Sequence, residues 1–415
     1  MAEESNSSTD LRRRRTLDRR EFITGAGAAA VSFSIIKPEL ARGSQANSKI
    51  ALGMIGCGGR GTWIADLFQQ HGGYRIVAAM DYFPDKVNPF GEKFNVPPER
   101  RYSGLLGYRR MLEGRVDAVA IESPPYFHPE QAAAAVEAGA HVYLAKPVAV
   151  DVPGCRSIEE SSGKASAKNR CFLVDFQTRT DPSYQEAIQR VHNGDIGPIL
   201  CGEAAYWAGS PFIRQLEQLR VDPADPERRL RAWGVDRALS GDVITEQNIH
   251  SLDVATWIMD GHPLRASGTG GLKSRREGSC WDHFSVIFTF PENVIVTFAS
   301  KQFGEGYDDI ICRMYGAKGV IDTHYAGNVA IWGKVPYEGG KSEGLYRDGA
   351  VRNIATFYEN VTESRFDNPT TAPSLRSNLT TILGRTAAYQ QAEVTWEQLM
   401  KSEERLDPKL QGLKE

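Results

Sequence analysis

Apolar runs alternate with amphipathic stretches along residues 49–177 of the chain. Short apolar runs at Ile50–Ile55 and Ile76–Met80 predict strands, and the apolar spacing of Thr62–Gln70 between them predicts a helix. The alternation continues with expected strands at Ala118–Ile121, His141–Leu144 and Cys171–Phe176 and an expected helix at about Pro129–Ala138. Strands separated by helices predict a parallel sheet, and ligands bind at the carboxyl edge of such sheets.

The pattern changes after residue 197, where β-rich segments extend to about residue 325. The segment WDHFSVIFTFPENVIVTFAS predicts a hairpin that turns at Pro291–Asn293. Arg220–Trp233 is charged and interrupted by prolines, so we expect a surface loop near the site. Two later segments, RNIATFYENVTES and SNLTTILGRTAAYQQAEVTWEQLM, have the spacing of helices that pack on a core or on a partner.

The first 47 residues have the features of an export signal. Basic residues precede a weakly apolar stretch at Ile23–Ile36. The order of residues resembles the twin-arginine signal at Arg19, Arg20, Phe22 and Ile23. A basic tail followed by an alanine-rich helix is the alternative, but charge, apolar core and small residues come in the order of a signal. We therefore expect export of the folded protein by the twin-arginine translocase, to the periplasm or to a tether on the outer side of the membrane.

The composition is that of a globular enzyme with room for two domains: 415 residues, 41% hydrophobic and 24% charged, with a formal net charge of -3. This balance does not favour nucleic acid or an anionic membrane surface as a partner. The six cysteines are scattered without a C-x-x-C pair. We expect them to be buried apolar residues rather than a disulfide framework or a metal site, although two could pair after export.

A glycine-rich turn separates the first predicted strand from the first predicted helix. Gly56, Gly58 and Gly61 fit G-x-G-x-x-G, whose glycines allow a tight turn, admit a pyrophosphate and let the helix pack on the strand. Asp81 follows the second strand, where a carboxylate accepts hydrogen bonds from ribose hydroxyls and repels a 2′-phosphate. The pattern predicts a Rossmann domain that favours NAD over NADP, with contacts at Gly56, Gly58, Gly59, Arg60, Gly61 and Asp81.

Several motifs together resemble the Gfo/Idh/MocA oxidoreductases. The segment ESPPYFH is similar to the family's Thr-Pro…His turn, AKP stands where Glu-Lys-Pro is usual, and SGDVITEQNIHSLDVATWI resembles the segment that carries the family's histidine. The resemblance implies an α/β fold, with a Rossmann domain at 48–177 and, at 178–415, a second α/β domain with an open, mostly antiparallel sheet. It also implies cofactor contacts at Ser123, Pro124, His128 and Lys146, and assembly as a homo-oligomer.

The same resemblance implies that Lys146 and His250 form the catalytic pair. His250 suits a general base because its ordinary pKa is near neutrality, and Lys146 suits a group that holds a developing alkoxide. Glu246, four residues before His250, would orient the ring or bind a substrate hydroxyl. Ala145 in place of a glutamate, and Glu246 and Asn248 in place of the usual aspartate and glycine, are departures from the family pattern. A structural histidine is the alternative, and no metal is expected because no further ligands have fitting spacing.

These features predict an exported NAD(P)-dependent oxidoreductase that transfers a hydride to or from a hydroxyl-bearing carbon of a sugar or cyclitol, with a tightly bound cofactor. Free NAD is not regenerated outside the cytoplasmic membrane, so a bound cofactor would have to be recycled within the enzyme. The alternatives are oxidation, elimination and reduction of a glycoside, and a binding protein without turnover. Four residues are expected either to form a wall for a sugar ring or to belong to the core: Tyr206, Trp207, Arg231 and Trp233.

Overall fold

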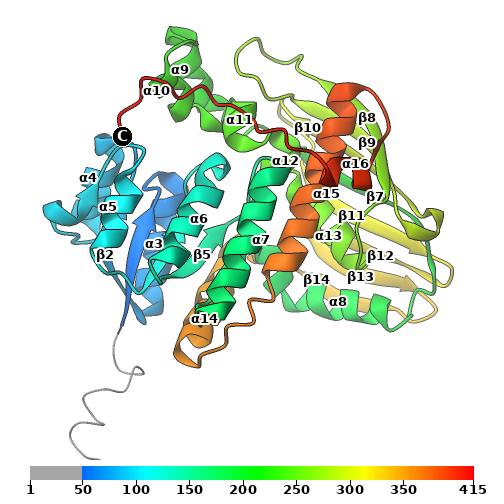
Figure 1. The fold of residues 1–415 in the computed structure, drawn as a ribbon. Coiled ribbons are helices and arrows are strands. Elements are labelled where there is room, and N and C mark those ends of the chain that lie inside the picture. The colour runs from blue at the N-terminus through cyan, green and yellow to red at the C-terminus, as the bar shows by residue number, and fades with distance from the viewer. Residues whose placement is uncertain (1–48) are drawn as a thin grey trace, which may run out of the picture. The chain divides into compact units, whose positions relative to one another are not determined.

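Two separate β-sheets organise residues 49–415, which are the residues that the computed structural model describes (Figure 1). Both sheets belong to one compact unit, residues 48–415. The predicted export signal at residues 1–47 lies outside the described residues. No helix within residues 49–415 combines the length and the apolar character needed to cross a membrane.

The first sheet has six parallel strands in the order β3-β2-β1-β4-β5-β6. Its strands are β1 (Ile50–Ile55), β2 (Tyr74–Met80), β3 (Arg101–Tyr102), β4 (Ala118–Ile121), β5 (His141–Ala145) and β6 (Phe172–Asp175). The helices between them are α3 (Gly59–His71), α4 (Pro84–Lys93), α5 (Gly107–Glu113), α6 (His128–Glu137) and α7 (Val152–Ala167). The predicted parallel sheet is confirmed. Because the order of the strands reverses between β1 and β4, a crevice for a ligand is expected at their carboxyl ends.

The second sheet has nine strands in the order β14-β13-β12-β11-β7-β10-β9-β8-β15. All neighbours are antiparallel except β7 and β10, so the predicted mostly antiparallel sheet is confirmed. Its strands are β7 (Ile199–Ala208), β8 (Arg265–Gly271), β9 (His283–Thr289), β10 (Ile295–Gln302), β11 (Asp309–Gly316), β12 (Gly319–His324), β13 (Asn328–Gly333), β14 (Tyr337–Lys341) and β15 (Val394–Thr395). The predicted hairpin turn at Pro291–Asn293 joins β9 to β10.

Helices cover the second sheet and fill the connections between the two sheets. α8 (Pro182–His192), α13 (Ile249–Ile258) and α15 (Thr371–Gln390) pack on its strands. The short helices are α9 (Leu216–Val221), α10 (Pro226–Arg231), α11 (Arg237–Ser240), α12 (Val243–Glu246) and α16 (Trp396–Met400). α14 (Leu345–Thr362) returns to the first sheet, where Ile354 and Phe357 join its apolar core and the Tyr74 hydroxyl donates to the Ile354 carbonyl at 2.8 Å.

The segment Arg220–Trp233 is not the loop that its prolines and charges predict. It contains α10 and the end of α9, and the Asp225 side chain caps α10 by accepting from the Glu227 amide at 2.9 Å. Pro226 occupies the first position of the helix, where a missing N–H costs nothing, so this proline starts a helix. Burial of Leu230 at 4% exposure anchors the segment to the rest of the molecule.

The cysteines have the predicted free state but not the predicted burial at every position. All six lie within the described residues and none forms a disulfide there. Five are buried, whereas Cys201 on β7 is exposed.

Candidate active site

The glycine turn after β1 is built so that only glycine fits at two of its positions. Gly56 has a φ of 93°, which side chains rarely adopt, and a Cβ there would lie 2.6 Å from the Glu122 carbonyl carbon. A Cβ on Gly61 would lie 1.9 Å from the Gly56 oxygen, so the first turn of α3 packs directly on the strand end. The first and third glycines of the motif therefore serve close packing of backbone on backbone.

The middle of the same turn is open toward a cavity. A Cβ on Gly58 or Gly59 would meet no atom within 4 Å, and both residues line the cavity. No side chain caps the amino terminus of α3, and no acidic residue lies in its first turn. The backbone amides and the positive end of the helix dipole are thus presented to this space, which is the environment that binds a pyrophosphate.

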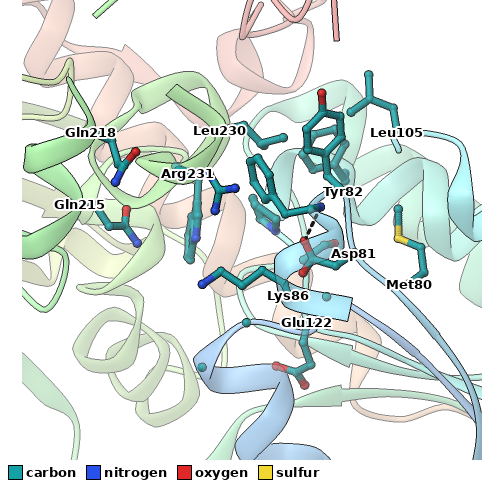
Figure 2. Close-up of a pocket in the computed structure, with 18 of the residues that line it drawn as sticks. Met80, Asp81, Tyr82, Lys86, Leu105, Glu122, Gln215, Gln218, Leu230 and Arg231 are labelled. Carbon is teal, nitrogen blue, oxygen red and sulfur yellow. Dashed lines mark hydrogen bonds between the residues drawn. The ribbon is translucent and has the colours of Figure 1, made fainter. Parts of the chain in front are cut away.

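The cavity has a volume of about 390 Å³ and extends from the glycine turn to the end of β2 (Figure 2). Ser123 and Pro124, which follow β4, line it as well, as the sequence predicts. Asp81 lines the cavity beside the glycine turn and accepts from the Cys57 amide at 2.8 Å and from the Phe83 amide at 3.0 Å. Burial raises the pKa of Asp81, and the two amides oppose this shift. A dinucleotide fits this arrangement, with its pyrophosphate at the glycine turn and a ribose at Asp81.

The structure places His128 between the turns that follow β4 and β5. Its two ring nitrogens lie 2.8 Å from the Ser123 and Pro147 carbonyl oxygens, and its side chain is buried. Burial lowers the pKa of His128 to about 4, although the two carbonyl groups favour the charged form. The ring holds the turns after β4 and β5 together through both of its nitrogens.

Arg60 points away from the predicted place at the pyrophosphate. Its guanidinium lies 3.1 Å from a Glu122 carboxylate oxygen and 2.6 Å from Asp175, and it donates to the Tyr346 hydroxyl at 2.8 Å. These groups come from α3, from the ends of β4 and β6, and from α14. The geometry makes the partly exposed Arg60 the centre of an ion cluster whose two carboxylates are fully buried, and Arg60 is not among the residues that line the cavity.

The ion cluster explains the alanine that stands beside Lys146. Ala145 pairs with Asp175 across β5 and β6, and the preceding pair, Ile121 with Leu144, places Glu122 next to Ala145 on the other side. Carboxylates that follow or end the two strands bordering β5 thus lie on either side of Ala145. The small alanine side chain leaves room for the Arg60 guanidinium, which contacts both carboxylates. Burial raises the pKa of Glu122 to about 7, and Arg60 opposes the shift. Sequence reasoning misses this cluster, although Glu122 directly follows one predicted strand and Asp175 lies near the end of another strand of the same sheet.

Lys146, which follows β5 of the first sheet, forms an ion pair with Glu246 at the end of α12. The Lys146 ammonium donates to the Glu246 carbonyl at 2.5 Å and lies 3.3 Å from its carboxylate, and each side chain is 9% exposed. Gln247 donates to the second carboxylate oxygen of Glu246 and accepts from the Tyr206 hydroxyl at 2.8 Å. Burial lowers the pKa of Lys146, and the charge of Glu246 opposes this shift.

His250 lies in the first turn of α13, four residues after Glu246, which ends the preceding helix α12, and it is buried at 8% exposure. Its Nδ1 has no hydrogen-bond partner among the described residues, and its ring packs against Tyr325 with 5.1 Å between centroids. Burial, followed by the positive charges of Lys146 and Arg60, lowers the pKa of His250 well below the ordinary value. The structure therefore brings the three predicted catalytic side chains together and keeps the imidazole neutral.

The four residues predicted as a possible sugar wall do not form one surface. Tyr206 is buried and bonded to Gln247, whereas Trp207 lines a second cavity of about 480 Å³ beside Tyr325. Arg231 and Trp233 line the cavity that contains Asp81. Alternating residues of β7 point to opposite faces of its sheet, which is why Tyr206 and Trp207 separate.

Two family models match the chain, one over each sheet. One, described as an oxidoreductase family with an NAD-binding Rossmann fold, matches residues 50–175, and the other, described as a GFO/IDH/MocA C-terminal domain, matches residues 184–322. The myo-inositol 2-dehydrogenase of Thermotoga maritima is 25% identical over 323 residues, which cover 75% of this chain and 87% of that protein.

Solved structures share the fold at low sequence identity. A levoglucosan dehydrogenase in complex with NADH and levoglucosan is 17% identical, with a TM-score of 0.68 over 84% of this chain and 99% of that one. The aldose-aldose oxidoreductase of Caulobacter crescentus is 20% identical, with a TM-score of 0.65 over the same shares of the two chains. At such low identities the comparison shows a shared fold, which includes the arrangement of both sheets.

Proposed function

The chain belongs to the Gfo/Idh/MocA oxidoreductase family, and on this premise we propose that it transfers a hydride between NAD and a hydroxyl-bearing carbon of a sugar or cyclitol. The observation that carries the proposal is the buried ion pair of Lys146 with Glu246 at the sheet edge that carries the glycine turn, near a buried His250 whose pKa is lowered by burial and by the Lys146 charge. The substrate class is supported by the relatives, which include an inositol dehydrogenase, a levoglucosan dehydrogenase and an aldose-aldose oxidoreductase.

The glycine turn and Asp81 hold the dinucleotide in this proposal. When bound, NAD accepts a hydride from a carbon that carries a hydroxyl group. Asp81 favours NAD over NADP because its carboxylate would repel a 2′-phosphate. Arg231 also lines this end of the cavity, but it is bound to both carboxylate oxygens of Asp85, at 2.7 and 3.1 Å, so its charge is already matched.

His250 takes the hydroxyl proton as the carbon loses its hydride. A base for this step must be neutral at working pH, and burial together with two nearby cations keeps the imidazole so. Its Nδ1 is buried without a partner in the described residues, so Nε2 is the ring nitrogen that accepts the proton in this proposal. The proton moves from the substrate oxygen to the imidazole as the carbonyl forms, so the oxygen carries no negative charge and the imidazole becomes positively charged until it passes the proton on.

Lys146 orients the substrate hydroxyl and stabilises negative charge on its oxygen. Its ammonium donates two hydrogen bonds to Glu246, one to the carbonyl and one to the carboxylate, which leaves a third N–H for the substrate. Glu246 is a positioning residue in this scheme, since it fixes the direction of the lysine side chain and reaches Gln247 with its other oxygen.

We extend the proposal to an exported enzyme that recycles a retained cofactor, with two sugars or one sugar in alternating oxidation and reduction. The twin-arginine pattern at residues 1–47 and the likeness to an aldose-aldose oxidoreductase support it. Analysis of the small molecules released when the purified protein is denatured tests it. Near-stoichiometric NAD or NADH, with turnover of mixed sugars in the absence of added cofactor, is expected. An empty protein that turns over only with added NAD would contradict retention.

A further inference from the structure

We propose that two segments remote from the catalytic residues clasp the adenosine half of the dinucleotide and slow its release. The strap consists of residues 213–233, and the second segment is the carboxyl-terminal stretch 401–415. This inference rests on the proposed function, since it concerns the same cofactor, and it assigns retention to residues that play no part in hydride transfer.

The strap supplies the second wall of the cavity that begins at the glycine turn. Gln215, Gln218 and Arg231 lie across the cavity from Asp81, and Lys86 extends between the two sides (Figure 2). Leu230 and Trp233 add apolar surface to the same wall, beside Phe83 and Phe127 of the first domain. A wall with an apolar part and amide groups suits an adenine ring, which presents flat faces and hydrogen-bonding edges.

Side-chain contacts hold the strap against the residues that follow β2 of the first sheet. Arg231 donates to both carboxylate oxygens of Asp85 on α4, at 2.7 and 3.1 Å, and its guanidinium lies 3.7 Å from the centre of the Phe83 ring. The Tyr82 hydroxyl donates to the Glu227 carboxylate at 2.8 Å. These contacts join a helix of the strap to the residues that immediately follow Asp81, so the mouth of the cavity is bridged where a ribose would lie.

The carboxyl-terminal segment lies over the outer side of the strap and ends beside the first domain. It leaves α16, runs past α11 and α10 and finishes near α4 and α5 (Figure 1). The Lys414 carbonyl accepts from the Leu105 amide at 2.9 Å, and the Lys414 amide donates to the Tyr82 hydroxyl at 3.2 Å. Leu410 and Leu413 pack against the apolar cluster that contains Phe83 and Leu230.

Tyr82 therefore joins the strap and the carboxyl-terminal segment in one set of contacts. Its hydroxyl donates to Glu227 and accepts from the Lys414 amide, and its ring packs on Phe83 with 4.7 Å between centroids. The pair of Arg231 with Asp85 is half exposed on the aspartate side, so it is weak by itself and sensitive to salt. Release of the dinucleotide requires these contacts to open together, which slows dissociation more than any one contact does.

The test measures how fast bound dinucleotide exchanges in the intact chain. Protein loaded with radiolabelled NAD is mixed with excess unlabelled NAD, and retained label is followed by rapid gel filtration. Asp85→Ala removes the partner of Arg231 without changing a residue that lines the cavity, and exchange about tenfold faster than in the parent chain is expected. A chain that ends at Pro408, and so lacks Leu410, Leu413 and Lys414, is expected to exchange faster as well.

Arg228→Ala is the matched control, since Arg228 lies on the same helix but pairs with Asp225 within the strap and does not line the cavity. It is expected to exchange label at the rate of the parent chain. Equal rates for Asp85→Ala, the shortened chain and Arg228→Ala would overturn the clasp and leave the proposed function standing. A parent chain that takes up no labelled NAD would overturn the proposed function, and the clasp with it.

Discussion

His250 is kept neutral by its surroundings, because burial and the charges of Lys146 and Arg60 all oppose a third positive charge. The imidazole is therefore neutral at a pH at which Lys146 and Arg60 are both positively charged. Such a difference between neighbouring titratable groups is typical of a site that performs acid–base chemistry.

Replacing His250 with Asn is expected to reduce kcat/KM by roughly 10²- to 10⁴-fold, because the base is lost while the polarity of the site is kept. The amount of dinucleotide released on denaturation should not change. Since the pKa of His250 is lowered, activity of the parent chain should persist as the pH falls through 6.5, and a pH profile of kcat/KM checks this. A variant as active as the parent chain would exclude His250 as the base.

Glu122 makes the folded protein less stable as the pH rises, whereas a carboxylate whose pKa is lowered on folding has the opposite effect. Its pKa is about 7 in the folded protein, whereas an unfolded glutamate titrates near 4.3, so the folded state binds the proton more tightly. The stabilisation from this proton is complete below about pH 4.3 and is lost as the pH rises through about 7.

Glu122→Gln removes this dependence. Between pH 5 and pH 8 the parent chain is expected to lose unfolding free energy relative to the variant, on the order of 1.4 kcal/mol for each pKa unit of the shift. Denaturant unfolding of both proteins at the two pH values measures the difference. Glu160→Gln, which alters an exposed carboxylate, should give no change with pH beyond a few tenths of a kcal/mol. A Glu122→Gln difference that is the same at both pH values would contradict the assigned burial effect.

The βαβ unit at the start of the first sheet shows how local signals predict an element. β1 has the predicted bounds, and α3 begins within the glycine motif, because the apolar period and the glycine spacing are both local. The helix α10 shows the opposite case. Its Asp225-Pro226 pair satisfies the rules for a helix start as well as those for a turn, and only the burial of Leu230 against Phe83 decides between them.

Different glycines of the turn serve folding and cofactor binding, since Gly61 packs against backbone and Gly58 faces the cavity. Gly61→Ala is expected to destabilise the protein by a few kcal/mol, since its Cβ would overlap the Gly56 oxygen. Gly58→Ala is expected to leave the melting temperature of the dinucleotide-free protein within about 2 °C of the parent value but to weaken NAD binding at least about tenfold, because its Cβ enters the open side of the turn. Calorimetry of stripped protein and a binding titration check both. Normal NAD binding by Gly58→Ala would mean that the pyrophosphate lies elsewhere.

At the scale of the whole molecule, the site depends on contacts between residues far apart in the sequence. Lys146 comes from the first sheet and Glu246 from the segment before α13, and Tyr346 reaches the ion cluster from α14. The sequence predicts the identity of the catalytic side chains through the family resemblance. It does not predict the return of α14 to the first sheet or the course of residues 401–415, because no local pattern encodes which distant surface an amphipathic segment covers.

The central claim is hydride transfer between the bound dinucleotide and a sugar or cyclitol carbon. The most direct measurement incubates purified protein, without added cofactor, with aldoses and inositols deuterated at their hydroxyl-bearing carbons, and then determines the mass of the released dinucleotide. The account predicts NADH with one deuterium for at least one substrate, formed roughly 10²-fold or more slowly by Lys146→Met and His250→Asn. Released dinucleotide that carries no deuterium with any sugar or cyclitol, from protein shown to be folded and loaded, would contradict it.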